Sequence, residues 1–131
     1  MKKRGLLGLC AVALVALAGP ALAADDVAQG KAAFAKCAIC HQVGPNAKTL
    51  VGPELNGIVG RKAGSVAGYN YSPGMKELGE KDYVWTEENL DKWITDPKAL
   101  LPTSPMALAY QGIKNADERA HIISYLKTFP E

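Results

Sequence analysis

Apolar residues recur along this chain at the spacing of an α-helix, and they predict its main elements. Thr86 can act as the N-cap of an expected helix at residues 85–94, which should end near Asp96. Asn115, followed three residues later by Glu118, resembles a capping box at the start of another expected helix at residues 115–129. No stretch alternates as a half-buried strand does, so the sequence predicts an all-α, single-domain fold. The expected helices are residues 25–36, 85–94 and 115–129.

The segment from Val43 to Pro73 contains many glycines and three prolines, and it predicts a loop with at most short helical pieces. A loop of this length is unusual in a compact domain. It becomes reasonable if the chain wraps around a large rigid cofactor.

The first 23 residues have the order of a secretory signal peptide. A basic head of Lys2, Lys3 and Arg4 precedes an apolar run and the cleavage pattern Ala-Leu-Ala at residues 21–23. We therefore expect residues 1–23 to be removed and residues 24–131 to form the mature domain. The leader carries three of the 15 basic residues and none of the 13 acidic ones. The mature chain is then slightly acidic, which excludes a basic nucleic-acid-binding protein. No later segment is long and apolar enough to span a membrane.

The cysteines carry the first chemical signal. Cys10 lies in the leader, which leaves Cys37 and Cys40, followed at once by His41. A zinc site normally needs four ligands, and the other histidine, His121, is distant in sequence. A thioredoxin-like pair would follow a strand, whereas the preceding segment predicts a helix. A disulfide between these cysteines would close only a small loop and add little stability. The remaining interpretation is covalent haem attachment, in which the two thiols reach the two vinyl groups and His41 reaches the iron.

A second axial ligand would close the other face of the iron. Met75, Met106 and His121 are the candidates in the mature chain. Met75 and Met106 fall in segments that we expect to be free of helix, and His121 falls in the last predicted helix. Spacing alone gives Met106 a slight preference over Met75, and an ordinary core methionine is the alternative for either.

Short motifs follow one another over nearly the whole mature chain. By their residues and their order, the chain resembles a class I cytochrome c of the soluble mitochondrial and α-proteobacterial type, over residues 27–129. The motifs are Gly30 and Phe34 before Cys37-Ala-Ile-Cys40-His41, residues 51–57 (VGPELNG), 60–64 (GRKAG), 68–72 (GYNYS), Trp85, 96–98 (DPK), 112–115 (GIKN) and 125–127 (YLK).

The resemblance implies a small cytochrome c fold of helices and loops around one haem, and a role for each matching residue. Met106 would be the distal ligand and His41 the proximal one. The carbonyl of Pro53 would hold the free imidazole N–H of His41. The residues expected to bind a haem propionate are Arg61, Tyr71 and Trp85.

The chain departs from the family pattern in three places. Five residues, 107–111, follow Met106 where the family usually has three, which leaves Tyr110 as the candidate for the aromatic residue of that loop. Pro105 and Ala99 stand where the mitochondrial type has lysines, so the ring of positive charge is thinned. Trp93 stands where a tyrosine near the iron-bound sulfur is common.

The resemblance implies a soluble periplasmic electron carrier rather than an enzyme. One haem c, attached through Cys37 and Cys40, would cycle between Fe(III) and Fe(II) and move single electrons between larger redox enzymes. Candidate partners are a quinol-oxidising cytochrome complex, an oxidase, a photosynthetic reaction centre and a dehydrogenase. Nucleic acid is not an expected partner, and a monomer is the default.

Two other functions remain open at this stage. A haem enzyme or a sensor of gases or peroxide would need Met106 to be displaceable. A membrane-tethered carrier would need an uncleaved leader, and residues 5–24 are uncharged. The Ala-Leu-Ala site favours cleavage.

Overall fold

The computed structural model describes residues 19–131. Most of the expected leader, residues 1–18, lies outside these residues. The described chain contains helices and an isolated bridge between Lys62 and Val84, with no strand. The all-α prediction is therefore confirmed. The helices are α1 (Gly19–Ala33), a turn of 3-10 helix (Phe34–Lys36), α2 (Pro73–Glu80), α3 (Glu87–Thr95), α4 (Pro97–Leu100), α5 (Pro105–Ala109) and α6 (Ala116–Leu126).

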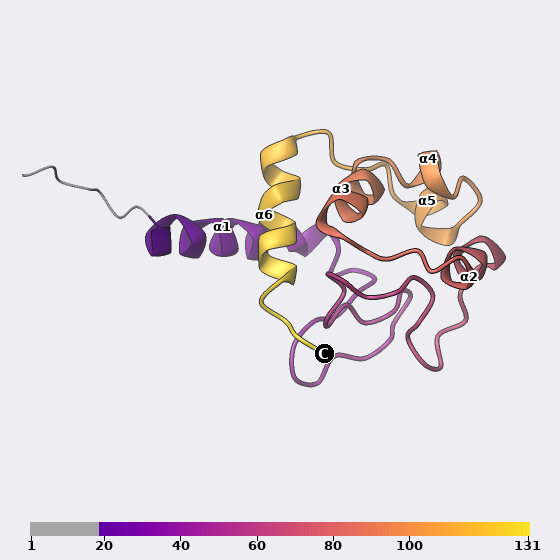
Figure 1. Ribbon diagram of the computed structural model, residues 1–131. Helices are drawn as coiled ribbons and strands as arrows, with labels where there is room; N and C mark the ends of the chain where they lie inside the picture. Colours follow the sequence, from indigo (N-terminus) through magenta and orange to yellow (C-terminus); the bar gives the residue numbers. More distant parts are fainter. Residues whose placement is uncertain (1–18) are drawn as a thin grey trace, which may run out of the picture.

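The first and last helices cross and form one side of the molecule (Figure 1). Gly30 lies at the crossing, where a Cβ would stand 2.7 Å from the Cβ of Tyr125 and would run into the carbonyl of His121. The absent side chain therefore lets the two backbones approach. The rings of Phe34 and Tyr125 pack with centroids 5.4 Å apart.

Each helix from α2 to α6 begins at a side chain that caps it. Thr86 accepts from the backbone N–H of Asn89 at 3.1 Å, and Asn115 accepts from that of Glu118 at 3.0 Å, as the sequence predicts. The other three capping residues each precede a proline at the first helical position, which suits a helix start. They are Ser72, Asp96 and Ser104.

These proline-initiated helices correct one expectation. Met75 and Met106 do not lie in loops, because α2 contains Met75 and α5 contains Met106. The prolines that suggested irregular chain instead occupy the one helical position that needs no N–H partner.

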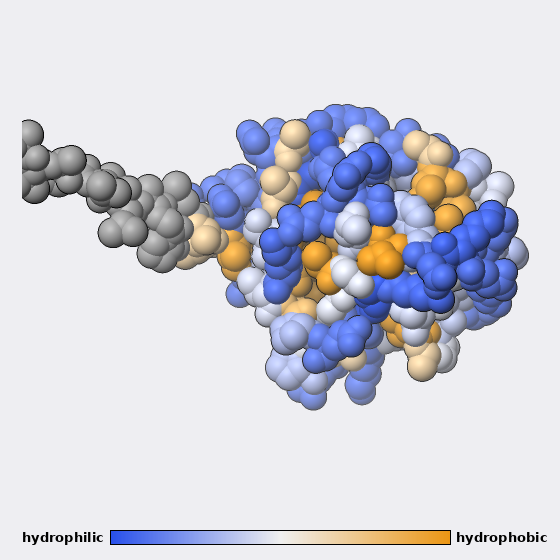
Figure 2. All heavy atoms as spheres, viewed as in Figure 1, coloured by the Kyte–Doolittle hydropathy of each residue, from blue (hydrophilic) through white to orange (hydrophobic). Residues whose placement is uncertain are grey.

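From residue 37 to residue 72 the chain forms turns and loops, in agreement with the sequence. These loops lie below α3 and α6 in Figure 1, and α2, α4 and α5 lie on the side away from α1. The buried core gathers between them around Trp85, Trp93 and Ile122. Most of the surface in the same view is hydrophilic, with small hydrophobic areas between (Figure 2). Among the described residues, none of the helices is both long and apolar enough to traverse a bilayer.

Candidate functional site

A cavity of about 390 Å³ lies between the loops of residues 37–72 and helices α3, α5 and α6. Its walls are mainly apolar side chains of the core. All eight residues that the sequence assigns to a haem site line it. They are Cys37, Cys40, His41, Pro53, Arg61, Tyr71, Trp85 and Met106.

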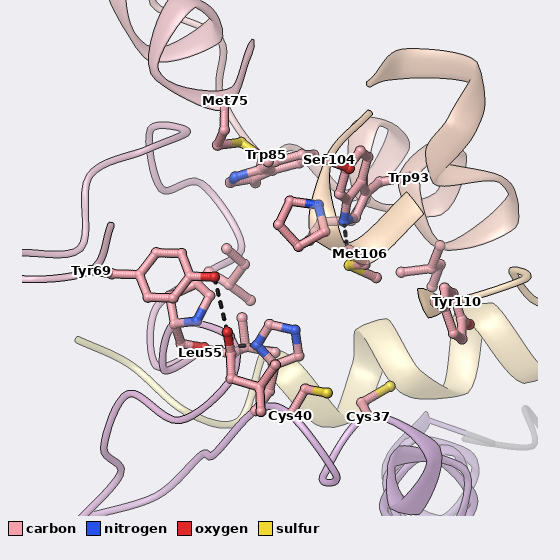
Figure 3. A pocket seen from close by; sticks show the side chains of 18 of the residues that line it. Cys37, Cys40, Leu55, Tyr69, Met75, Trp85, Trp93, Ser104, Met106 and Tyr110 are labelled. Carbon is pink, nitrogen blue, oxygen red and sulfur yellow. Dashed lines mark hydrogen bonds between the residues drawn. The ribbon is translucent and has the colours of Figure 1, made fainter. Parts of the chain in front are cut away.

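Cys37 and Cys40 lie on one helical turn that continues from the 3-10 helix. The N–H of Cys37 donates to the carbonyl of Phe34 at 2.8 Å, and that of His41 donates to the carbonyl of Cys37 at 2.9 Å. The two cysteines form no disulfide, and their sulfurs point into the cavity (Figure 3). Burial raises the pKa of Cys37 to about 11. The Cys37 thiol therefore stays protonated, and the sulfurs of Cys37 and Cys40 lie on one helical turn, as attachment to the two vinyl groups of one porphyrin requires.

His41 is fixed from behind by the loop that follows it. Its Nδ1–H donates to the carbonyl of Pro53 at 2.7 Å, which leaves Nε2 as the nitrogen that can bind a metal. Gly52 packs against the ring, and a Cβ there would stand 2.7 Å from Nδ1. Burial is the largest cause that lowers the pKa of His41, outweighing the bond to Pro53. The imidazole is thus kept neutral, which is the form that ligates metals.

Met106 lies on the opposite side of the cavity from the two cysteines (Figure 3). Ser104 caps α5 just before it by accepting from the N–H of Ala107 at 3.2 Å. The indole Nε1–H of Trp93 donates to the sulfur of Met106 at 3.1 Å. Trp93 thus offers the sulfur the kind of donor that the family's tyrosine would offer.

The other two candidates for a distal ligand are placed differently. Met75 lines the cavity, and it lies next to Trp85 in Figure 3. His121 lies outside the cavity lining, with its Nε2 3.4 Å from a carboxylate oxygen of Asp26. The structure therefore brings Met75 and Met106 to the site and leaves His121 at the helix crossing.

Arg61 is buried at another part of the cavity wall. Its guanidinium donates to the carbonyls of Asn56 at 2.7 Å and Glu54 at 2.9 Å, and it pairs with the Glu54 carboxylate at 3.3 Å. The Tyr71 hydroxyl accepts from the N–H of Val66 at 3.0 Å and keeps its own proton available to donate. Nothing in the sequence singled out Glu54, although it lies within the matching motif of residues 51–57.

Tyr110, the candidate aromatic residue of the segment after Met106, also carries a hydroxyl that the sequence did not single out. Its ring lines the cavity, and its hydroxyl is buried with no hydrogen-bond partner among the described residues. Burial is the main cause that raises the pKa of Tyr110 to about 12, so the phenol stays neutral.

These features fit a c-type haem. The cavity offers two thiols on one helical turn, a neutral imidazole with one free nitrogen, and a thioether opposite, in apolar surroundings. Imidazole and thioether are a donor pair that suits haem iron. Between residues 19 and 131 no three His, Cys, Asp or Glu side chains cluster as a metal site, so a zinc centre has no donor set there.

Comparison with known proteins decides the family. The pattern of the family described as "Cytochrome c" matches residues 27–130. The chain belongs to the cytochrome c family. It is 47% identical over 108 residues to cytochrome c2 of Rhodomicrobium vannielii, covering 82% of each chain. It is 48% identical over 101 residues to cytochrome c2 of Agrobacterium tumefaciens, covering 77% of this chain and 89% of the relative.

Solved structures agree with this assignment. The structure of cytochrome c2 from Rhodospirillum centenum superposes with a TM-score of 0.72 at 38% identity, covering 81% of this chain and 99% of that one. Cytochrome cH from Methylobacterium extorquens gives a TM-score of 0.69, also at 38% identity, covering 79% and 98%. The protein is therefore an electron carrier of the cytochrome c2 type and not an enzyme. It carries haem c bound covalently through the Cys37 and Cys40 pair.

Proposed function

We propose that this cytochrome c is a periplasmic shuttle whose iron is held by His41 and Met106, and which exchanges single electrons with larger redox enzymes. The observation that supports this best is the bond from Trp93 to the Met106 sulfur, 3.1 Å long, on the side of the cavity opposite the cysteines. It orients a thioether where the second axial ligand would be needed. The haem, when bound, supplies one-electron Fe(III)/Fe(II) chemistry.

The protein's own residues then set how that chemistry proceeds. Pro53 holds the imidazole of His41, and Trp93 holds the sulfur of Met106, so the two side chains that would hold the iron are already oriented by the protein. Apolar walls favour the reduced state, because the oxidised iron carries more charge. With His41 and Met106 both on the iron, exogenous ligands such as oxygen or carbon monoxide would find no open coordination site.

Arg61, Tyr71 and Trp85 are proposed to bind the haem propionates. The guanidinium of Arg61 is buried and shares its hydrogen bonds with Glu54 and Asn56, so its charge is held in place against the cavity. A carboxylate that is taken out of water needs such donors nearby. We expect the loss of one propionate donor to weaken haem binding less than the loss of one thioether bond from Cys37 or Cys40 would.

The experiment that tests the proposal is the absorption spectrum of the purified holoprotein, oxidised and reduced, for the wild type and Met106→Ala. A Met–iron charge-transfer band in the oxidised wild type that disappears in the variant would support ligation by Met106. A high-spin wild-type spectrum, or rapid carbon monoxide binding by the untreated reduced protein, would contradict it and favour an open haem site.

Export is part of the proposal. Residues 1–23 are proposed to direct the chain to the periplasm and to be cleaved after Ala23, which leaves residues 24–131 as the cytochrome domain. Mass spectrometry of the holoprotein from the periplasmic fraction tests this. A mature chain that begins at Ala24 supports it, and an intact leader in the membrane fraction supports a tethered carrier instead.

A further inference from the structure

One guanidinium joins two parts of the chain that lie on either side of the proposed distal ligand in the sequence. Arg119 lies on α6, and its Nε and Nη2 donate to the two carboxylate oxygens of Asp91 on α3, at 2.7 and 3.4 Å. Its Nη1 donates to the backbone carbonyls of Ile113 and Lys114, at 3.1 and 3.0 Å. Only 11% of the Arg119 side chain is exposed, against 42% for Asp91. The planar fork of arginine suits this set of acceptors, which the single ammonium of a lysine does not match.

The residues bonded to Arg119 are close in sequence to the groups that orient Met106. Asp91 lies two residues before Trp93 on α3, and the indole of Trp93 donates to the Met106 sulfur. Ile113 lies at the far end of the segment that follows Met106. Arg119 therefore connects the helix that carries the donor with the segment that carries the acceptor.

The same segment is also fastened to the end of α3 by its backbone. The N–H of Ile113 donates to the carbonyl of Ile94 at 2.8 Å, and the ammonium of Lys114 donates to that of Thr95 at 2.9 Å. Gly112 approaches so closely that a Cβ there would stand 2.1 Å from the carbonyl oxygen of Thr95. These carbonyls belong to the last turn of α3, where the helix itself provides no partner for them. The guanidinium thus completes a junction at which the segment, α3 and α6 meet.

A second ion pair between α3 and α6 provides a contrast. Lys127 follows the last residue of α6, and its ammonium donates to the carboxylate of Glu87, the first residue of α3. About half of each side chain is exposed, and within the described part of the chain neither bonds to residues 112–114. This pair joins the same two helices without touching the segment after Met106.

We propose that Arg119 is a positioning residue for Met106. Its bonds to Asp91 and to the carbonyls of residues 113–114 hold the segment after Met106 against α3, and so keep the sulfur facing its donor on that helix. Local opening of a segment has to break the contacts that fasten it, so four bonds from one side chain make opening rarer. The inference rests on the proposed function, because it takes Met106 to be the distal ligand.

Amide hydrogen exchange of the holoprotein measures this opening directly. The N–H of Tyr110 donates to the carbonyl of Met106 at 2.9 Å, and that of Ile113 donates to Ile94, so both amides report on the segment. In Arg119→Gln both should exchange about tenfold faster, which corresponds to about 1.4 kcal/mol in the opening equilibrium. Amides of α1 should change by less than about twofold, since that helix is not part of the junction.

Two variants separate the fork from charge and from general loss of stability. Lys127→Gln removes the other ion pair between α3 and α6 and should leave both amides within about twofold of the wild type. Arg119→Lys keeps a cation near Asp91 but loses the fork, so its exchange rates should be intermediate, and it serves as the test if Arg119→Gln does not fold. Wild-type rates in both Arg119 variants, or an equal acceleration in Lys127→Gln, would overturn the proposal.

Imidazole added to the oxidised holoprotein supplies a readout at the iron. The observed affinity rises with the fraction of molecules whose binding site is open, so Arg119→Gln should bind imidazole about tenfold more tightly than the wild type. Lys127→Gln should bind it as the wild type does. Unchanged affinity in Arg119→Gln, even with faster exchange, would mean that the segment opens without releasing the sulfur and would overturn the positioning role.

Failure of the proposed function gives a different result. The oxidised wild type would then lack the Met–iron charge-transfer band. If the inference about Arg119 alone is wrong, the wild type keeps that band, and Arg119→Gln matches it in amide exchange and in imidazole affinity.

Discussion

The hydrogen bond from Trp93 to Met106 gives the sharpest prediction about the haem potential. The indole Nε1–H donates to the sulfur at 3.1 Å, and the Trp93 side chain is buried on α3. With Met106 as the proposed ligand, a donor on one lone pair of its sulfur would leave less electron density for the iron. Because Fe(III) needs that density more than Fe(II), the bond favours the reduced state. Trp93→Phe removes the donor and should lower the reduction potential.

The size of the effect is limited by the energy of the bond. A buried hydrogen bond contributes about 0.5 to 1.5 kcal/mol. A one-electron couple shifts by about 59 mV for each tenfold change in its equilibrium constant, which corresponds to about 1.4 kcal/mol. If the whole bond energy differs between the two oxidation states, the potential falls by about 20 to 60 mV, and partial retention gives less.

Trp93→Tyr is the matched control. Both variants lose volume in the core, and they differ by a single hydroxyl that can donate to the sulfur in place of the indole. Spectroelectrochemical titration at fixed pH and salt should therefore place Trp93→Tyr close to the wild type and Trp93→Phe below both. Equal potentials in the two variants would show that the cavity, and not the hydrogen bond, sets the shift, and would refute the reasoning.

Three further changes test the ligand, the helix crossing and the unpaired phenol. Met106→Ala should produce a high-spin haem with a lower potential and rapid carbon monoxide binding, read by absorption spectroscopy; an unchanged spectrum would exclude ligation by Met106. Gly30→Ala should destabilise the fold by about 3 kcal/mol in denaturant unfolding, because its Cβ would run into the carbonyl of His121; a loss below about 0.5 kcal/mol would mean that the helices separate at little cost. Tyr110→Phe should stabilise the protein by about 1 kcal/mol, since it removes a buried hydroxyl that has no partner; a lower unfolding midpoint would reveal a partner in the holoprotein.

The fold was predictable where its signals are local. Periodicity located α3 and α6, and the caps Thr86 and Asn115 fixed their first turns, because a cap needs only residues three positions apart. Helices α4 and α5 have four and five residues, too few to show a period. Their signal was a capping side chain followed by proline, which sequence reasoning took for irregular chain.

The candidate site likewise has one part that local sequence spacing predicts and another that depends on the tertiary fold. The attachment segment was readable because Cys37, Cys40 and His41 lie within one helical turn, and local spacing alone sets their geometry. The contacts of Trp93 with Met106 join helices whose relative position depends on the whole core. The resemblance to a family supplied those positions, whereas spacing alone gave Met106 only a slight preference over Met75.

The two axial sides of the cavity differ in how firmly the chain holds them. His41 follows two cysteines that become covalently attached to the haem, its backbone N–H donates to Cys37, and its ring is bonded to Pro53. Met106 belongs to a helix of five residues, and the side-chain hydrogen bonds there are the Ser104 cap and the bond from Trp93 to its sulfur. Since local opening follows the segments with fewest fixed contacts, the Met106 side is where this carrier can be adjusted or opened. Residues 107–109 of the lengthened segment belong to that same short helix, and Leu108 within it is exposed, so one small segment joins the proposed ligand to the molecular surface.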